Sequence, residues 1–77
     1  MTINVLFFGV AADITGKSKI EFTDVNDTDG LRKQLVEKYN TLEKSHFIFA
    51  LNKQVVKENT KLSDGDTVAI LPPFSGG

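Results

Sequence analysis

The sequence predicts an α+β domain in which a mixed sheet of about five strands packs on one main helix. The chain has 77 residues, which is enough for one domain, and 40% of them are hydrophobic, which is too many for a disordered chain. Short β-branched and aromatic runs are separated by turn residues along most of the chain. One central segment instead has the spacing of an amphipathic helix.

Two paired strands are expected in the N-terminal third of the chain. Residues 3–8 are β-branched and aromatic and end at Gly9, and residues 19–23 alternate apolar and polar side chains. Residues 11–17 contain glycine and small side chains, so we predict a connection there. The expected cross-strand partners are Val5 and Phe7 on the first strand and Ile20 and Phe22 on the second.

A helix of about three turns is predicted in the middle of the chain. Asp27 or Thr28 is expected to be its N-cap, and Asp29 would lie near the positive end of the helix dipole. Gly30 in the first turn should cost about 1 kcal/mol relative to alanine. The apolar positions that recur every three or four residues are Leu31, Leu35, Tyr39 and Leu42.

The C-terminal half is predicted to contain two longer strands and one short one. Residues 47–51 are strand-like, and residues 52–54 form a turn into a short strand at residues 55–56. Residues 62–66 form a turn into the last strand, residues 67–71. Because the first and last strands are long and apolar, we expect them to be central neighbours, as in the β-grasp arrangement. Roll-like α+β folds with another strand order remain alternatives.

The charge and the cysteine content exclude several classes of function. Nine basic and ten acidic residues give a net charge of −1, without the positive excess that is typical of nucleic-acid-binding proteins. The absence of cysteine excludes disulfides, thiolate nucleophiles and cysteine-based zinc sites. No apolar run has the length of a membrane span. We therefore expect a cytoplasmic protein without a nucleic-acid or membrane partner.

Candidates for catalysis or metal binding are few. His46 is the single histidine and is expected to lie in a surface loop. The segment 64–66, Asp-Gly-Asp, is more typical of a turn than of a calcium loop, because further ligands are missing at the required spacing. Gly9 and Gly16 are too far apart for a phosphate-binding loop. The chain is therefore not expected to be catalytic alone or to bind a cofactor or metal.

The C-terminus has an unusual composition. Pro72 and Pro73 follow the last strand directly and hold an extended backbone, and the chain ends at Gly76 and Gly77. Six residues beyond Leu71 span up to ~20 Å, and a terminal glycine carries no Cβ that would hinder attack on its carboxylate. An inert terminus and a reactive tail are both open interpretations. We expect a domain at residues 1–71 and a protruding tail at residues 72–77.

Several motifs together are similar to those of the molybdopterin synthase small subunits, a family of ubiquitin-like β-grasp sulfur carriers. The resemblance covers the whole chain in order, although Ala12 and Phe74 depart from the residues that are usual in this family. The segments that carry the resemblance are Val5-Leu6-Phe7-Phe8-Gly9, Ala11, Thr15-Gly16, Leu31-Arg32, Ala50-Leu51-Asn52, Asp64-Gly65-Asp66, Val68-Ala69 and, apart from Phe74, Pro72-Pro73-Phe74-Ser75-Gly76-Gly77.

This resemblance implies a mechanism centred on Gly77. A ubiquitin-activating-like adenylyltransferase would use ATP to adenylate Gly77, and a sulfur donor of the cysteine desulfurase or rhodanese type would convert it to a thiocarboxylate. The tail would then enter the large subunit of a heterotetrameric synthase and give its sulfur to cyclic pyranopterin monophosphate. The catalytic side chains would belong to the large subunit. The residues expected to insert with Gly77 are Pro72, Pro73, Phe74, Ser75 and Gly76.

Strand alternation predicts which surface meets the partner. If Ile3, Val5, Phe7, Val68 and Ile70 face the helix, then Leu6, Phe8 and Leu71 remain on the outer face near the start of the tail. An exposed apolar cluster on a small domain is typical of a partner interface, although a loop covering it is an alternative. Two other functions are also open: a sulfur carrier for thiamine thiazole synthesis or tRNA thiolation, and a β-grasp interaction module with an inert tail.

Overall fold

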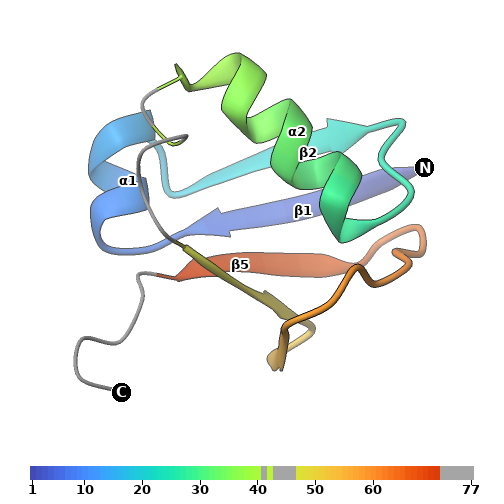
Figure 1. The fold of residues 1–77 in the computed structure, drawn as a ribbon. Coiled ribbons are helices and arrows are strands. Elements are labelled where there is room, and N and C mark those ends of the chain that lie inside the picture. The colour runs from blue at the N-terminus through green and yellow to red at the C-terminus, as the bar shows by residue number, and fades with distance from the viewer. Residues whose placement is uncertain (41, 43–46, 72–77) are drawn as a thin grey trace.

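The computed structural model describes residues 1–40, 42 and 47–71 (Figure 1). Five strands form one mixed sheet in the order β2-β1-β5-β3-β4, and helix α2 lies across one face of it (Figure 1). This is the predicted α+β architecture. The elements are β1 (Thr2–Phe7), α1 (Val10–Thr15), β2 (Lys19–Thr23), α2 (Thr28–Lys38), β3 (Ile48–Leu51), β4 (Gln54–Val56) and β5 (Thr67–Leu71).

The first and last strands are neighbours near the middle of the sheet, as predicted. They run parallel, with Val5 opposite Val68 and Leu6 opposite Ala69. β1 and β2 are antiparallel, and Val5 stands opposite Ile20 as expected, but the expected pairing of Phe7 was wrong. Phe22 stands opposite Ile3. Phe7 has no partner in β2 because that strand begins at Lys19, which already stands opposite Leu6.

Residues 10–15 form the short helix α1, so the predicted connection was wrong at this point. The two flanking glycines, which suggested a loop, are the residues that cap the helix. Gly9 has φ 56° and Gly16 has φ 71°, and the Gly16 N–H donates to the Ala12 carbonyl. The Thr15 hydroxyl also donates to the Ala11 carbonyl at 3.0 Å. A helix of six residues is too short to show a periodic pattern.

The N-terminus of α2 is capped by Asp27, one of the two predicted caps. Its Oδ1 accepts a hydrogen bond from the Gly30 N–H at 2.8 Å. A Cβ at Gly30 would lie 3.0 Å from this same oxygen, so the glycine leaves room for the cap. The helix ends at Lys38, and Leu42 lies beyond it although its side chain is buried.

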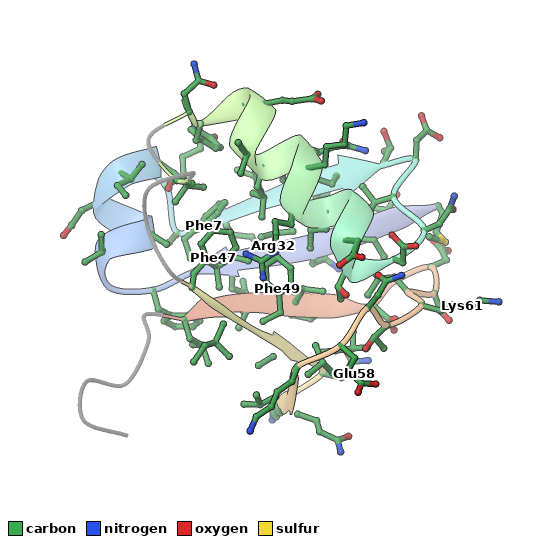
Figure 2. The ribbon with its side chains drawn as sticks, in the orientation of Figure 1. Phe7, Arg32, Phe47, Phe49, Glu58 and Lys61 are labelled. Carbon is green, nitrogen blue, oxygen red and sulfur yellow. The ribbon has the colours of Figure 1, made fainter. Side chains whose placement is uncertain are left out.

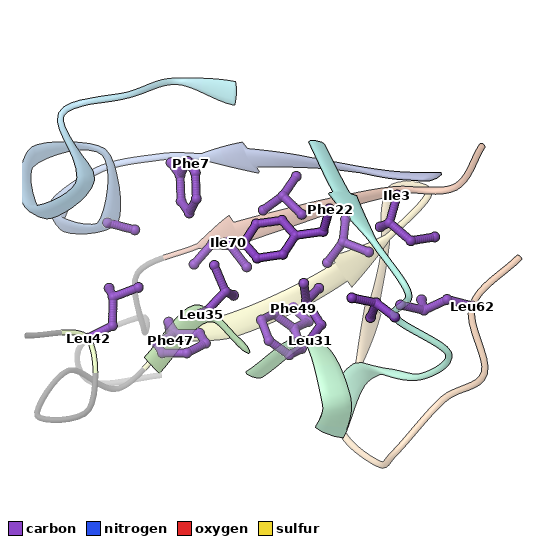
Figure 3. Packing of buried hydrophobic residues seen from close by; sticks show 14 residues of the cluster. Ile3, Phe7, Phe22, Leu31, Leu35, Leu42, Phe47, Phe49, Leu62 and Ile70 are labelled. Carbon is purple, nitrogen blue, oxygen red and sulfur yellow. The ribbon is translucent and has the colours of Figure 1, made fainter. Parts of the chain in front are cut away.

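The core lies between α2 and the inner face of the sheet (Figure 3). The predicted division of β1 and β5 into two faces is confirmed, because every second residue of each strand is buried. Tyr39 contacts the edge of Phe7, with ring centroids 6.2 Å apart. The buried cluster comprises Ile3, Val5, Phe7, Ala11, Phe22, Val25, Leu31, Leu35, Leu42, Phe47, Phe49, Leu62, Val68 and Ile70.

The segment before β5 is a turn, as predicted. Asp64 Oδ1 accepts from the Thr2 N–H at 2.7 Å, and Asp66 Oδ2 accepts from the Ser63 N–H at 2.7 Å. The Asp66 carboxylate therefore stabilises the turn itself, and the Asp64 carboxylate joins it to β1. The part of the chain that the structure describes contains no group of three or more metal-ligating residues. It also contains no helix that is long and apolar enough to cross a membrane.

Candidate functional site: the outer face of the sheet

A row of apolar side chains crosses four strands on the face of the sheet that is opposite α2. The register places Leu6 beside Ala69, Ala69 beside Ala50, and Ala50 beside Val55. Directly opposed residues project to the same face of a sheet. The two central positions, Ala69 and Ala50, have short side chains. The surface is therefore shallower there than at the larger side chains of Leu6 and Val55 on either side.

Two further apolar residues lie where β1 and β5 end. Phe8 is 46% exposed, and its N–H donates to the Ile70 carbonyl at 3.1 Å, which holds it alongside β5. Leu71, the last residue of β5, is half-buried and stands opposite Ile48. The same end of the sheet carries α1 (Figure 1). The predicted interface residues Leu6, Phe8 and Leu71 thus share the outer face, close to the point where residue 72 begins.

A groove of about 410 Å³ lies on this face. Leu6 and Phe8 line it, whereas Leu71 lies outside it at the end of β5. One end of the groove, at Leu6 and Phe8, is apolar, and the other, at Asn52, Lys53 and Thr67, is polar. The described lining residues are Leu6, Phe8, Ala50, Asn52, Lys53, Thr67 and Ala69.

The polar end is built by the turn between β3 and β4. The Asn52 side chain accepts from the Thr67 N–H at 3.0 Å and donates to Asp66 Oδ1 at 3.1 Å. The backbone N–H of Asn52 also donates to the Thr67 carbonyl at 2.8 Å. Sequence reasoning did not identify Asn52, Lys53 or Thr67 as site residues. Their proximity follows from the pairing of β3 with β5, which no local pattern reveals.

The predicted reactive tail lies outside the described residues. This applies to Gly77, to the insertion residues Pro72, Pro73, Phe74, Ser75 and Gly76, and also to His46. The structure does place Leu71, from which the tail continues, on a strand flanked by β1 and β3. The last residue before the predicted tail is therefore at the end of an interior strand of the sheet and on its outer face.

The chain was compared with known protein families and with solved structures. The model of the ThiS family matches residues 5–77. The chain belongs to the ThiS family. The chain is also similar to the molybdopterin synthase sulfur carrier subunit of Chlamydomonas reinhardtii. The two are 36% identical over 83 aligned positions, and the alignment covers the whole of both chains. The resemblance to the small-subunit family is therefore confirmed over the full length.

Solved structures agree with this membership of the ThiS family. A complex of subunits 1 and 2 of the molybdopterin-converting factor from Helicobacter pylori contains a chain that is 35% identical, with a TM-score of 0.74 and complete coverage of both chains. SAMP1 from Haloferax volcanii has a TM-score of 0.82, again with complete coverage, at 20% identity, and it supports the fold alone. The ubiquitin-like β-grasp fold of this ThiS-family chain is thereby confirmed.

Proposed function

We propose that this chain is the sulfur carrier of molybdenum cofactor biosynthesis and that the carboxyl group of Gly77 carries the sulfur as a thiocarboxylate. The observation that carries the proposal is the similarity to molybdopterin synthase sulfur carrier subunits over the full length of this chain, which ends in Gly76-Gly77. The carrier works in the cytoplasm, where ATP is available to its activating enzyme.

The chemistry requires activation of a carboxylate. An adenylyltransferase binds ATP, the Gly77 carboxylate attacks the α-phosphorus, and pyrophosphate leaves. A persulfide of a cysteine desulfurase or rhodanese-type donor then attacks the acyl carbon and displaces AMP. A thiol reduces the resulting acyl disulfide, which leaves the thiocarboxylate on Gly77. The absence of a Cβ at Gly76 and Gly77 suits a narrow channel in each partner.

Sulfur transfer takes place inside the large subunit of the synthase. The thiocarboxylate sulfur attacks a side-chain carbon of cyclic pyranopterin monophosphate, and the carbon–oxygen bond at that carbon breaks, with the oxygen leaving on the phosphate or as water. Hydrolysis of the resulting thioester leaves the sulfur on the pterin and restores the carboxylate of Gly77. Pro72, Pro73, Phe74, Ser75 and Gly76 occupy the channel behind Gly77. The catalytic side chains come from the large subunit, and two carriers bind a large-subunit dimer in a heterotetramer.

The outer face is the surface that docks on the large subunit. Leu6, Phe8 and Leu71 place apolar area beside the start of the tail, and a homologous chain occurs in a complex of subunits 1 and 2. Docking of this face would direct residues 72–77 into the partner. The globular domain acts as an anchor that positions a reactive terminus, since binding supplies the orientation that the reaction needs.

Intact-mass measurement tests the proposal. The purified chain is incubated with an adenylyltransferase of the family, ATP and a sulfur donor, and its mass should increase by the exchange of one oxygen for sulfur. Addition of the large subunit and cyclic pyranopterin monophosphate should return the mass to its starting value and yield molybdopterin. A chain whose mass never changes would be an interaction module with an inert tail. A charged chain that yields no molybdopterin would belong to another sulfur pathway.

A further inference from the structure

We propose that Lys53 contributes to binding of the large subunit, by pairing its ammonium group with a carboxylate of that subunit at the polar end of the outer-face groove. The inference rests on the proposed function, because it concerns the surface that docks on that subunit. It adds a charged contact to an interface that the sequence predicts as apolar.

The backbone at Lys53 is the first observation. Leu51 stands opposite Gln54, so Asn52 and Lys53 form a two-residue turn between β3 and β4. Both have positive φ, 48° at Asn52 and 74° at Lys53, which is the pattern of a type I′ turn. Glycine is strongly favoured at the second position of this turn, and a side chain there strains the backbone. A lysine in a strained conformation is a reason to look for a function.

The second observation is that this turn is held in place. The Asn52 side chain bonds to Thr67 and Asp66, and its backbone N–H bonds to the Thr67 carbonyl. These contacts fix the turn against the start of β5, so the lysine stem starts from a rigid position at the rim of the groove. Because the backbone of the turn is already fixed, it loses little conformational entropy when Lys53 binds a partner.

The third observation is the charge distribution. Lys53 is the one charged residue among the described residues that line the groove. Asp66 lies nearby, but its Oδ1 accepts from Asn52 Nδ2 and its Oδ2 accepts from the Ser63 N–H. A partner that covers the whole groove, including its polar end, would also desolvate the ammonium group. A cation that loses water without gaining a partner opposes binding, so the complementary surface must carry an acid at this place.

Binding measurements at several salt concentrations test this inference. The affinity of the purified large subunit is measured for the wild-type chain, Lys53→Gln, Lys53→Gly and Lys53→Arg. We expect Lys53→Gln and Lys53→Gly to bind about 10-fold more weakly and with a flatter dependence on salt, whereas Lys53→Arg stays within about 3-fold of the wild type. Lys53→Gly relieves the strained backbone, so its melting temperature should not fall, and its weaker binding would not reflect unfolding.

Lys33→Gln is the matched control. Lys33 is exposed on α2, which covers the opposite face of the sheet, and its substitution changes the net charge by the same amount. This variant should bind within about 2-fold of the wild type. The inference would be overturned if Lys33→Gln and Lys53→Gln lost equal affinity for the large subunit, or if Lys53→Gln bound as tightly as the wild type. Either result would leave the proposed function intact. No binding by the wild-type chain at any salt concentration would overturn the proposed docking and this inference with it.

Discussion

The guanidinium carbon of Arg32 lies 4.6 Å from the centre of the Phe47 ring and 4.8 Å from that of Phe49 (Figure 2). The two rings are themselves 5.4 Å apart. Arg32 is exposed on α2, whereas both rings are buried. The planar guanidinium group of Arg32 on α2 therefore covers the rings of Phe47 and Phe49 in the core.

This arrangement predicts that Arg32→Lys destabilises the fold although it keeps the charge. An ammonium group does not stack on a ring as a guanidinium does, and the expected loss is about 0.5–1 kcal/mol. Thermal denaturation should show a melting temperature lower by roughly 2–8 °C for a domain of this size. The neighbouring substitution Lys33→Ala serves as the control and should have a smaller effect. An unchanged melting temperature for Arg32→Lys would show that the stacking contributes nothing.

The position of the terminal carboxylate should be essential. One residue added after Gly77 converts the reactive carboxylate into an amide, and deletion of Gly77 withdraws it by about 3.4 Å, a displacement large enough to abolish a reaction that needs alignment. Gly76→Ala should have an intermediate effect, because a Cβ must then pass through the channel. Mass analysis after activation should show no thiocarboxylate for the first two variants.

All three terminal variants should retain a normal melting curve, because the changes lie in the sequence beyond the last strand, β5, which ends at Leu71. A C-terminally extended chain that still supported molybdopterin synthesis without being trimmed to Gly77 would contradict the carrier function.

Substitution of Phe8 or Leu71 by Asp should abolish association with the large subunit without unfolding the domain. Phe8 is 46% exposed, so a carboxylate there remains hydrated in the free chain but is buried without a partner in the complex. Size-exclusion chromatography of the mixed subunits measures the association, and circular dichroism checks the fold. Val10→Asp is the control, since Val10 is 55% exposed and lies outside the groove. Unfolding of Phe8→Asp would place that side chain in the core.

The cap of α2 should stabilise the domain measurably. Asp27 accepts from Gly30 through Oδ1, and its Oδ2 accepts from Asn59 Nδ2 at 3.3 Å, so it also joins the helix to the segment after β4. Asp27→Ala should lower the free energy of unfolding by about 1–2 kcal/mol. Glu37→Ala removes the same charge from an exposed position of the helix and should cost less. Equal effects of both substitutions in urea denaturation would argue against the cap.

Local patterns predicted those parts of the fold that depend on side-chain periodicity. The bounds of β2 and β5 match the predicted ranges, and alternation placed Leu6 and Phe8 on the outer face. α1 was missed because six residues contain too few turns to reveal a period.

The groove could not be predicted in full, because its polar end depends on contacts between distant segments. Residues 52–54 were predicted as a three-residue turn, but the pairing of Leu51 with Gln54 shortens it to two residues and places Lys53 at the groove. The pairing of Ile3 with Phe22 likewise depends on the path of the chain through α1, which connects β1 to β2. This path sets the register of the two strands and cannot be read from the alternation within either strand.

The parallel pairing of β1 with β5 has a mechanical consequence. A partner that pulls on the chain beyond Leu71 applies its force along β5, which is bonded to β1 on one side and to β3 on the other. This force runs along the strands and therefore across hydrogen bonds that are perpendicular to them in the antiparallel ladder with β3 and slanted in the parallel ladder with β1, so the bonds of both ladders must shear together instead of opening one at a time. The carrier can therefore be withdrawn from a tight channel without its sheet unravelling from the end that is gripped.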